Sequence, residues 1–185
     1  MGPLVVVLLC PLALGWAAED VSARSLILFI GDGMGPQIVS IVKLYSETFL
    51  ERDLNMVRLA NDGATGYVTT HPENTMVTDS AASGTAIATG HRTNNGMLGV
   101  TPDGEVVVNL FEMAVKQGKS VGVVTTTSVT DATPAVFLAH ARSRQMHNDI
   151  ARQIVESDAS VVMGGGWWFF LPPDKGKRPD GVDLT

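Results

Sequence analysis

The chain has 185 residues, of which 45% are hydrophobic and 17% charged. This balance is typical of a folded globular protein and excludes disordered, collagen-like and coiled-coil classes. Thirteen Lys and Arg residues against nineteen Asp and Glu residues give a net charge of −6, so no basic excess attracts nucleic acid or anionic lipid. An anionic ligand would have to be held by local charge.

The N-terminus carries an apolar run from Leu4 to Trp16 that contains Cys10, the only cysteine. The run is too short to span a bilayer and is followed by small residues, which is typical of a secretory signal peptide. We expect residues 1–17 to be removed, and the product to be secreted, periplasmic or extracellular. The alternative is a membrane-retained anchor, because no Lys or Arg precedes the run.

Beyond this run, strand-like and helix-like patterns alternate, which predicts an α/β fold: a mainly parallel central sheet with helices on both faces. The predicted strands are 26–30, 64–70, 120–127 and 160–163. The predicted helices are a run from Pro36 to Tyr45, then Ser80–Thr89, 107–117 and 148–157. The last twenty residues contain no capped element, so we expect a domain that is incomplete at its C-terminus.

The first polar motif is the GDGMG run at 31–35, directly after the predicted strand 26–30. It is not a dinucleotide-binding loop, because Pro36 stands where the third glycine is needed, and no Gly-Lys-Ser/Thr follows. A carboxylate at the carboxyl end of a buried strand suits a metal ligand, so Asp32 is a candidate. The alternative is a tight turn in which Asp32 caps the next helix.

The second motif is VTDSAASGT at 77–85, which opens a predicted helix of very small residues. Ser80 would lie in the first helical turn, where unpaired N–H groups and the helix dipole favour an anion such as phosphate. The alternative is an ordinary helix start, in which Asp79 is the N-cap and the small residues only allow close packing.

The third motif is TDATP at 130–134, followed by Arg144. Asp131 and Thr133 offer hard oxygen ligands two residues apart, which suit Mg²⁺, and an arginine can grip two phosphate oxygens as a fork. The alternatives are a helix-start turn at Asp131 and a solvated helix charge at Arg144.

Two further groups of residues point to structure rather than chemistry. The histidines show no metal-binding spacing and are expected to be structural or surface residues: His71, His91, His140 and His147. The aromatic run at 167–170 is expected to pack against the missing part of the domain rather than to form a binding platform.

Residues 28–35, 77–90 and 131–144, in this order, resemble the metal-dependent alkaline phosphatases. The resemblance covers nearly all of 25–166, and the run TDSAASGTAIATG is its most specific part. It implies hydrolysis of phosphate monoesters through a phosphoserine intermediate. Ser80 would be the nucleophile, and Arg144, oriented partly by Asp79, would clamp the phosphate.

The resemblance also implies two zinc ions and one magnesium ion. Asp32 would bridge one zinc ion and the magnesium ion, and Ser80 would itself meet a zinc ion. Thr133 would ligate the magnesium ion, and Asp131 would hold the water shell of that ion.

The pattern of this family continues past Thr185 and includes further metal ligands. We therefore expect residues 18–185 to be the N-terminal part of a catalytic domain, with weak metal binding and little activity alone, and homodimers as the family habit implies. Alternatives within the superfamily are a phosphodiesterase, a phosphomutase or a sulfatase, although the sulfatase motif Cys/Ser-x-Pro-x-Arg is absent at Ser80. A non-catalytic phosphate- or metal-binding module is the alternative from another class.

Overall fold

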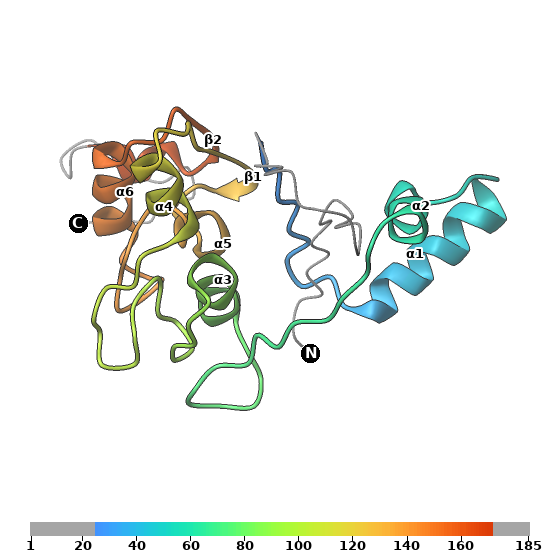
Figure 1. The fold of residues 1–185 in the computed structure, drawn as a ribbon, viewed down its shortest axis with the longest axis horizontal. Helices are drawn as coiled ribbons and strands as arrows, with labels where there is room; N and C mark the ends of the chain where they lie inside the picture. Colours follow the sequence, from blue (N-terminus) through green and yellow to red (C-terminus); the bar gives the residue numbers. More distant parts are fainter. Residues whose placement is uncertain (1–24, 172–185) are drawn as a thin grey trace, which may run out of the picture. The chain divides into compact units, whose positions relative to one another are not determined.

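A computed structural model describes residues 25–171 of the chain (Figure 1). The chain forms two compact units, one running to Thr69 and the other beginning at Thr70, and each is considered by itself. The predicted signal peptide lies outside the described residues. Within 25–171, no helix is both long enough and apolar enough to cross a bilayer.

The first unit contains two helices, α1 (Pro36–Phe49) and α2 (Asn55–Asp62). Pro36 occupies the first turn of α1, where its missing N–H costs nothing. The helix predicted from Pro36 is therefore confirmed. Helix α2 was not predicted, because Leu54 stands at its N-cap and offers no capping side chain. Ser46 is the only buried residue of either helix, and its hydroxyl donates to Arg52 O at 2.7 Å.

The two strands predicted around these helices are wrong. Residues 26–30 and 64–70 form no strand, and no pairing with another described residue is present. Their apolar side chains are largely exposed, with Phe29 75% and Tyr67 92% accessible. A β-strand needs a hydrogen-bonded neighbour, so apolar, β-prone composition alone does not make these segments strands.

The second unit contains, in chain order, α3 (Ser80–Thr89), α4 (Leu110–Lys116), β1 (Gly122–Ser128), α5 (Ala132–Ala135), α6 (His147–Glu156), β2 (Val161–Gly165) and the 3₁₀ helix η1 (Trp167–Phe170). Strands β1 and β2 pair in parallel, with Gly122 opposite Val161. The chain between them passes through α5 and α6, so this β–α–β unit confirms the predicted α/β class. Among the described residues the sheet has these two strands.

Caps fix where the helices of this unit begin and end. Helix α3 matches its prediction, since Asp79 caps its start and Gly90, with φ +75°, ends it. Helix α4 begins three residues later than predicted. Asn109 is its N-cap and forms a capping box with Glu112.

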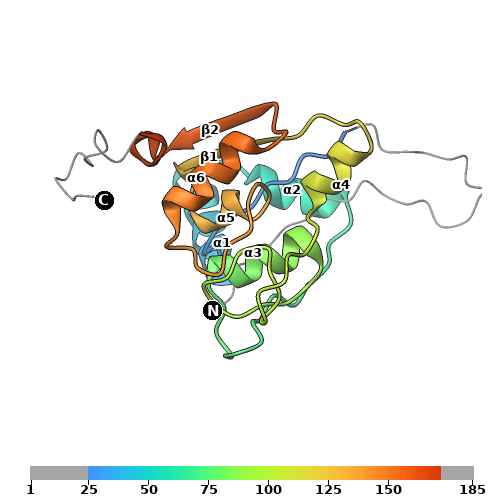
Figure 2. The same ribbon diagram turned by 90° about the vertical axis from the view of Figure 1, so that its left-hand side faces the viewer.

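The core of the second unit lies where α5 packs between β1 and α3 (Figure 2). The buried face of α3 consists of small residues, among them Ala81, Ala82 and Gly84. A Cβ atom placed on Gly84 would lie 3.2 Å from Val136 Cγ2, so glycine allows the chain at the end of α5 to approach α3 closely. The contact holds α3 and α5 against each other, so both helices begin in the same unit of the fold.

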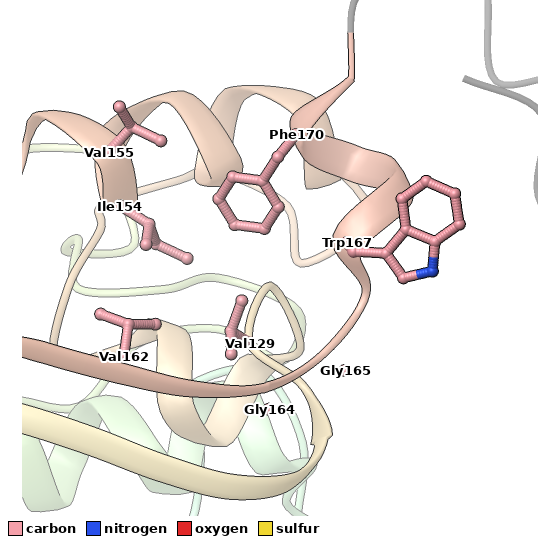
Figure 3. Close-up of a pocket in the computed structure, with 8 residues that line it drawn as sticks. All are labelled: Val129, Ile154, Val155, Val162, Gly164, Gly165, Trp167 and Phe170. Atoms are coloured by element: carbon pink, nitrogen blue, oxygen red, sulfur yellow. The ribbon is translucent and has the colours of Figure 1, made fainter. Parts of the chain in front are cut away.

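The aromatic run at 167–170 forms η1, which contacts α6. Phe169 stacks on His147 with ring centroids 4.4 Å apart. Phe170 lines an apolar pocket of about 320 Å³ together with Ile154 and Val162, whereas the Trp167 ring points away from these side chains (Figure 3). Phe169 and Phe170 therefore pack against described residues of the second unit, while Trp167 stays 61% exposed. The packing predicted against the missing part of the domain stays a prediction.

Candidate active site

Ser80 is the first residue of α3 and is half-buried. Asp79, the N-cap, has an extended backbone, and its Oδ1 accepts a hydrogen bond from Ala82 N at 2.9 Å. The capping expected of Asp79 is thus confirmed. It leaves Ser80 at the positive end of a ten-residue helix, where an anion is electrostatically favoured.

Asp131 is the N-cap of α5, and its Oδ1 accepts from the adjacent Ala132 N at 2.8 Å. The Thr127 hydroxyl at the end of β1 donates to Asp131 Oδ2 at 3.2 Å. Thr133 is the second residue of α5. The structure therefore confirms a helix-start turn at TDATP, and that turn presents the Asp131 carboxylate next to the carboxyl end of β1.

Arg144 joins these two helix starts. Its Nη2 donates to Asp131 Oδ1 at 2.8 Å, and its Nη1 donates to Asp79 Oδ2 at 3.4 Å. The residue lies in the loop between α5 and α6, and its side chain is only 27% exposed. The alternative of a solvated helix charge is therefore wrong. The structure brings Asp79, Ser80, Asp131 and Arg144 into one site.

The electrostatics of the site favour an ionised Asp131. Burial has the largest single influence on its carboxyl group and raises the pKa. The hydrogen bond from Ala132 and the hydrogen bond and charge of Arg144 act against burial, and the Thr127 hydroxyl adds to them. Together they outweigh it, so the pKa of Asp131 lies below its ordinary value of 3.8.

One loop of the site, which contains Asn95 and Gly96, was not identified from the sequence. The Asn95 Oδ1 accepts from Asp79 N at 2.9 Å, and Gly96 N donates to Asp79 Oδ2 at 3.0 Å. Gly96 has φ +85°, and Asn-Asn-Gly is a turn sequence. That turn signal could have marked the loop, but nothing in it indicated that the loop reaches Asp79.

Asp32 lies in the first unit, in the turn before α1, and is exposed. Gly33 gives this turn a φ of +68°. The N-cap of α1 is Gly35, with no side-chain cap, so the alternative in which Asp32 caps the helix is wrong.

The described residues do not form a complete metal site by themselves. In 25–171, no three His, Cys, Asp or Glu side chains gather closely enough to hold an ion. Asp131 and Thr133 lie together at the start of α5 and offer oxygen donors, the type that Mg²⁺ prefers. Mg²⁺ prefers octahedral coordination, so these two residues would supply part of its ligand shell.

The histidines make structural or surface contacts, as expected. His140 lies between Gly99 O at 2.7 Å and Glu112 Oε1 at 2.9 Å, which ties the loop before α6 to α4. Other ring contacts join His147 to the Thr130 hydroxyl, His71 to Arg92, and His91 to Thr89 O.

The fold and the site define an α/β protein with a serine at the start of a helix and a loop arginine held by the carboxylates that cap two helices. The chain belongs to the alkaline phosphatase family. The model of that family, described as alkaline phosphatase, matches residues 23–185.

Similar proteins agree with this assignment. The chain is 35% identical to alkaline phosphatase 4 of Bacillus subtilis over 75% of its length and 30% of that protein. It is 31% identical to the tissue-nonspecific alkaline phosphatase of Gallus gallus over 88% of its length and 39% of that protein. The chain thus spans about a third of the length of these curated relatives.

Solved structures give the same result. The alkaline phosphatase of Thermus thermophilus matches with a TM-score of 0.73 and 38% identity, over 83% of this chain and 32% of that one. A variant of the TAB5 alkaline phosphatase, described with Mg bound in its M3 site, matches with a TM-score of 0.64 and 33% identity, over 83% and 41% of the two chains.

Proposed function

We propose that this chain takes part in the hydrolysis of phosphate monoesters, with Ser80 as the nucleophile. The observation that carries the proposal is the position of Arg144, which touches the N-cap residues of both α3 and α5 while Ser80 begins α3. A phosphate at this place would meet the helix N-terminus and a guanidinium together. Family membership supports the same reaction class.

In the proposed first step, Ser80 Oγ attacks phosphorus, the bond from phosphorus to the ester oxygen breaks, and the alcohol leaves with a proton. Water then attacks the phosphoserine, the Oγ–P bond breaks, a proton from the water restores the Ser80 hydroxyl, and inorganic phosphate leaves. The equatorial oxygens would be stabilised by the N–H groups at the start of α3 and by Arg144. Two Arg144 nitrogens contact Asp79 and Asp131, and its remaining N–H groups are available to an anion.

We further propose that the reaction requires metal ions, two zinc and one magnesium, with Asp32, Ser80, Asp131 and Thr133 among the ligands. Bound metal would make the Ser80 hydroxyl acidic enough to attack and would stabilise the leaving oxygen. The described residues do not close such a site on their own.

The test is hydrolysis of p-nitrophenyl phosphate by the full chain with added Zn²⁺ and Mg²⁺. We expect a low turnover that falls to the background rate in Ser80→Ala and when a chelator removes the metal ions. Ser40→Ala, which changes a serine in the first unit, should leave the rate unchanged. Equal rates for the wild-type chain and Ser80→Ala would contradict the proposal.

A second measurement separates catalysis from binding. Incubation with phosphate at acid pH, followed by mass spectrometry, should find phosphate covalently attached to Ser80. Phosphate that binds without a covalent adduct would favour a non-catalytic binding module. Faster turnover of a phosphodiester or a sulfate ester than of the monoester would favour the related hydrolases instead.

We also propose export of the protein, from the apolar run between Leu4 and Trp16 and the small residues after it. Expression of the full chain in a secreting host should yield extracellular or periplasmic protein whose first residue is Ala18. Retention of the run in the membrane fraction would favour the anchor.

A further inference from the structure

Asn95 lies beside the chain that leads into α3, and its side chain is fully engaged there. Its Oδ1 accepts from Asp79 N at 2.9 Å. Its Nδ2 donates to Val77 O at 2.8 Å and to the Thr75 hydroxyl at 3.2 Å. A side-chain amide offers one acceptor oxygen and two donor hydrogens. The oxygen and both hydrogens of the Asn95 amide are therefore hydrogen-bonded to residues 75–79, which immediately precede Ser80.

The main chain around Asn95 ties the same segment to Arg144. Gly96 N donates to Asp79 Oδ2 at 3.0 Å, and Gly96 O accepts from Arg144 N at 2.7 Å. The turn is closed by a hydrogen bond from Met97 N to Asn94 O at 3.1 Å. One short turn thus contacts both the residue before the proposed nucleophile and the residue proposed to clamp the phosphate.

We propose that Asn95 is a positioning residue for the reaction proposed at Ser80, and this inference rests on that proposed function. Asp79 is held at its backbone by Asn95 and at its carboxylate by Ala82 and Gly96. Ser80 is its covalent neighbour, so these bonds position the main chain from which the Ser80 hydroxyl projects. A displacement of about 1 Å in a reacting group can cost about 100-fold in rate.

The contacts of Asn95 distinguish this role from general stabilisation. They end on a polar loop, whereas α3 is held by its small residues against α5. The Asn95 side chain is hydrogen-bonded to no part of Arg144. The main-chain N–H of Arg144 instead donates a hydrogen bond to the Gly96 carbonyl. Loss of the Asn95 side chain should therefore move the nucleophile more than the phosphate clamp.

The experiment compares kcat and KM for p-nitrophenyl phosphate in the full wild-type chain, Asn95→Ala and Asn94→Ala, with Zn²⁺ and Mg²⁺ present. Asn94 is the matched control, because it has the same side chain, is adjacent, and makes no side-chain hydrogen bond with any other described residue. For Asn95→Ala we expect kcat to fall by about 10- to 100-fold, with KM within about two-fold of wild type. Asn94→Ala should match wild type in both.

Hydrogen exchange supplies a readout that does not depend on turnover. In Asn95→Ala the Asp79 amide should lose protection, while amides in the middle of α3 keep theirs and the melting temperature stays near that of wild type. A variant that loses protection throughout α3 or melts much lower would show a purely structural role and would overturn the inference.

The remaining outcomes separate the two proposals. If the wild-type chain turns over substrate and Asn95→Ala keeps its kcat, or changes KM alone, the role of Asn95 is overturned and the proposed function stands. If wild type and Ser80→Ala are equally inactive, the proposed function is overturned, and the role of Asn95 falls with it.

Discussion

Asp79 and Asp131 each perform two tasks with one carboxylate. Each caps the helix that follows it and also receives a guanidinium nitrogen of Arg144. A capping role and a site role are often weighed against each other when a sequence is interpreted. Here the cap fixes the carboxylate in place, and a fixed carboxylate can hold Arg144 in one orientation. For Asp79 and for Asp131, the capping role and the role in the site are therefore compatible, and the first supports the second.

The lowered pKa of Asp131 predicts how stability depends on pH. A carboxyl group whose pKa is lower in the folded than in the unfolded chain stabilises the fold above its unfolded pKa, here 3.8, and loses this contribution as pH falls through the folded value. We expect the wild-type chain to be more stable than Asp131→Asn at neutral pH, with the difference shrinking below about pH 4. Urea unfolding at a series of pH values measures it.

A difference between the two proteins that stays constant from neutral to acid pH would contradict this prediction. It would mean that the charge of the Asp131 carboxylate adds nothing to the free energy of unfolding and that the two variants differ only through the shape of the side chain. Because the Asp131 side chain is 38% exposed, solvent screens its interaction with Arg144, and the effect should be modest.

At the scale of elements, the sequence predicts best the helices and strands whose ends are marked by a local signal, such as a capping residue. Asp79 and Gly90 marked both ends of α3, and β1 and β2 lie within two residues of their predicted bounds. Helix α2 was missed because Leu54 gives no capping signal. The segments 26–30 and 64–70 were predicted as strands from composition, but pairing is a property of two segments, and neither pairs with a described residue.

Local sequence patterns predict the residue types of the site, whereas the contact of Arg144 with Asp79 is predicted by the family resemblance alone. Ser80, Asp131 and Arg144 were identified from their motifs. The ion pair between Arg144 and Asp79 joins residues far apart in the chain, so no local pattern encodes it. Asn95 was missed for the same reason, since a turn residue acquires its role only from the segment that folds against it.

The packing of α3 on α5 yields a prediction at this scale. A Cβ atom on Gly84 would already lie 3.2 Å and 3.3 Å from the two methyl groups of Val136. Gly84→Leu should therefore force α5 away from α3 and separate Asp131 from Asp79, which Arg144 now bridges. We expect a loss of about 1–3 kcal/mol in the free energy of unfolding, together with reduced phosphomonoester turnover.

Ala86→Leu is the control for this change, because it adds a leucine to the same helix at a less buried position. It should alter the free energy of unfolding by no more than about 0.5 kcal/mol. Denaturant unfolding of the two variants gives the comparison. Equal effects would show that α3 tolerates bulk at Gly84 and that close approach to α5 is not required.

At the scale of the whole molecule, the two units differ in how much apolar surface they bury. Helices α1 and α2 bury a single residue, Ser46, whereas the second unit buries residues such as Leu98, Val136 and Ile150 almost completely. The chain is 45% hydrophobic overall, which is enough for a core. Composition does not reveal how that apolar content is shared between parts of the chain.

The exposed run at 25–30 leads to a prediction about association. Leu26, Ile27 and Phe29 are 67%, 75% and 75% exposed, and their segment is β-prone without a partner strand among the described residues. Such a segment can pair with a second chain. We expect concentration-dependent association in light scattering, and we expect Phe29→Lys to reduce it, because a charge in the run must be desolvated when two chains pair.

Ser25→Lys supplies the control, since it adds the same charge to an exposed polar position in the same segment. Both substitutions bring the net charge of −6 closer to zero, which by itself promotes association. A decrease seen only with Phe29→Lys must therefore come from the apolar contact rather than from repulsion between whole molecules. If neither variant changes the scattering, the run 25–30 is not the surface through which chains associate.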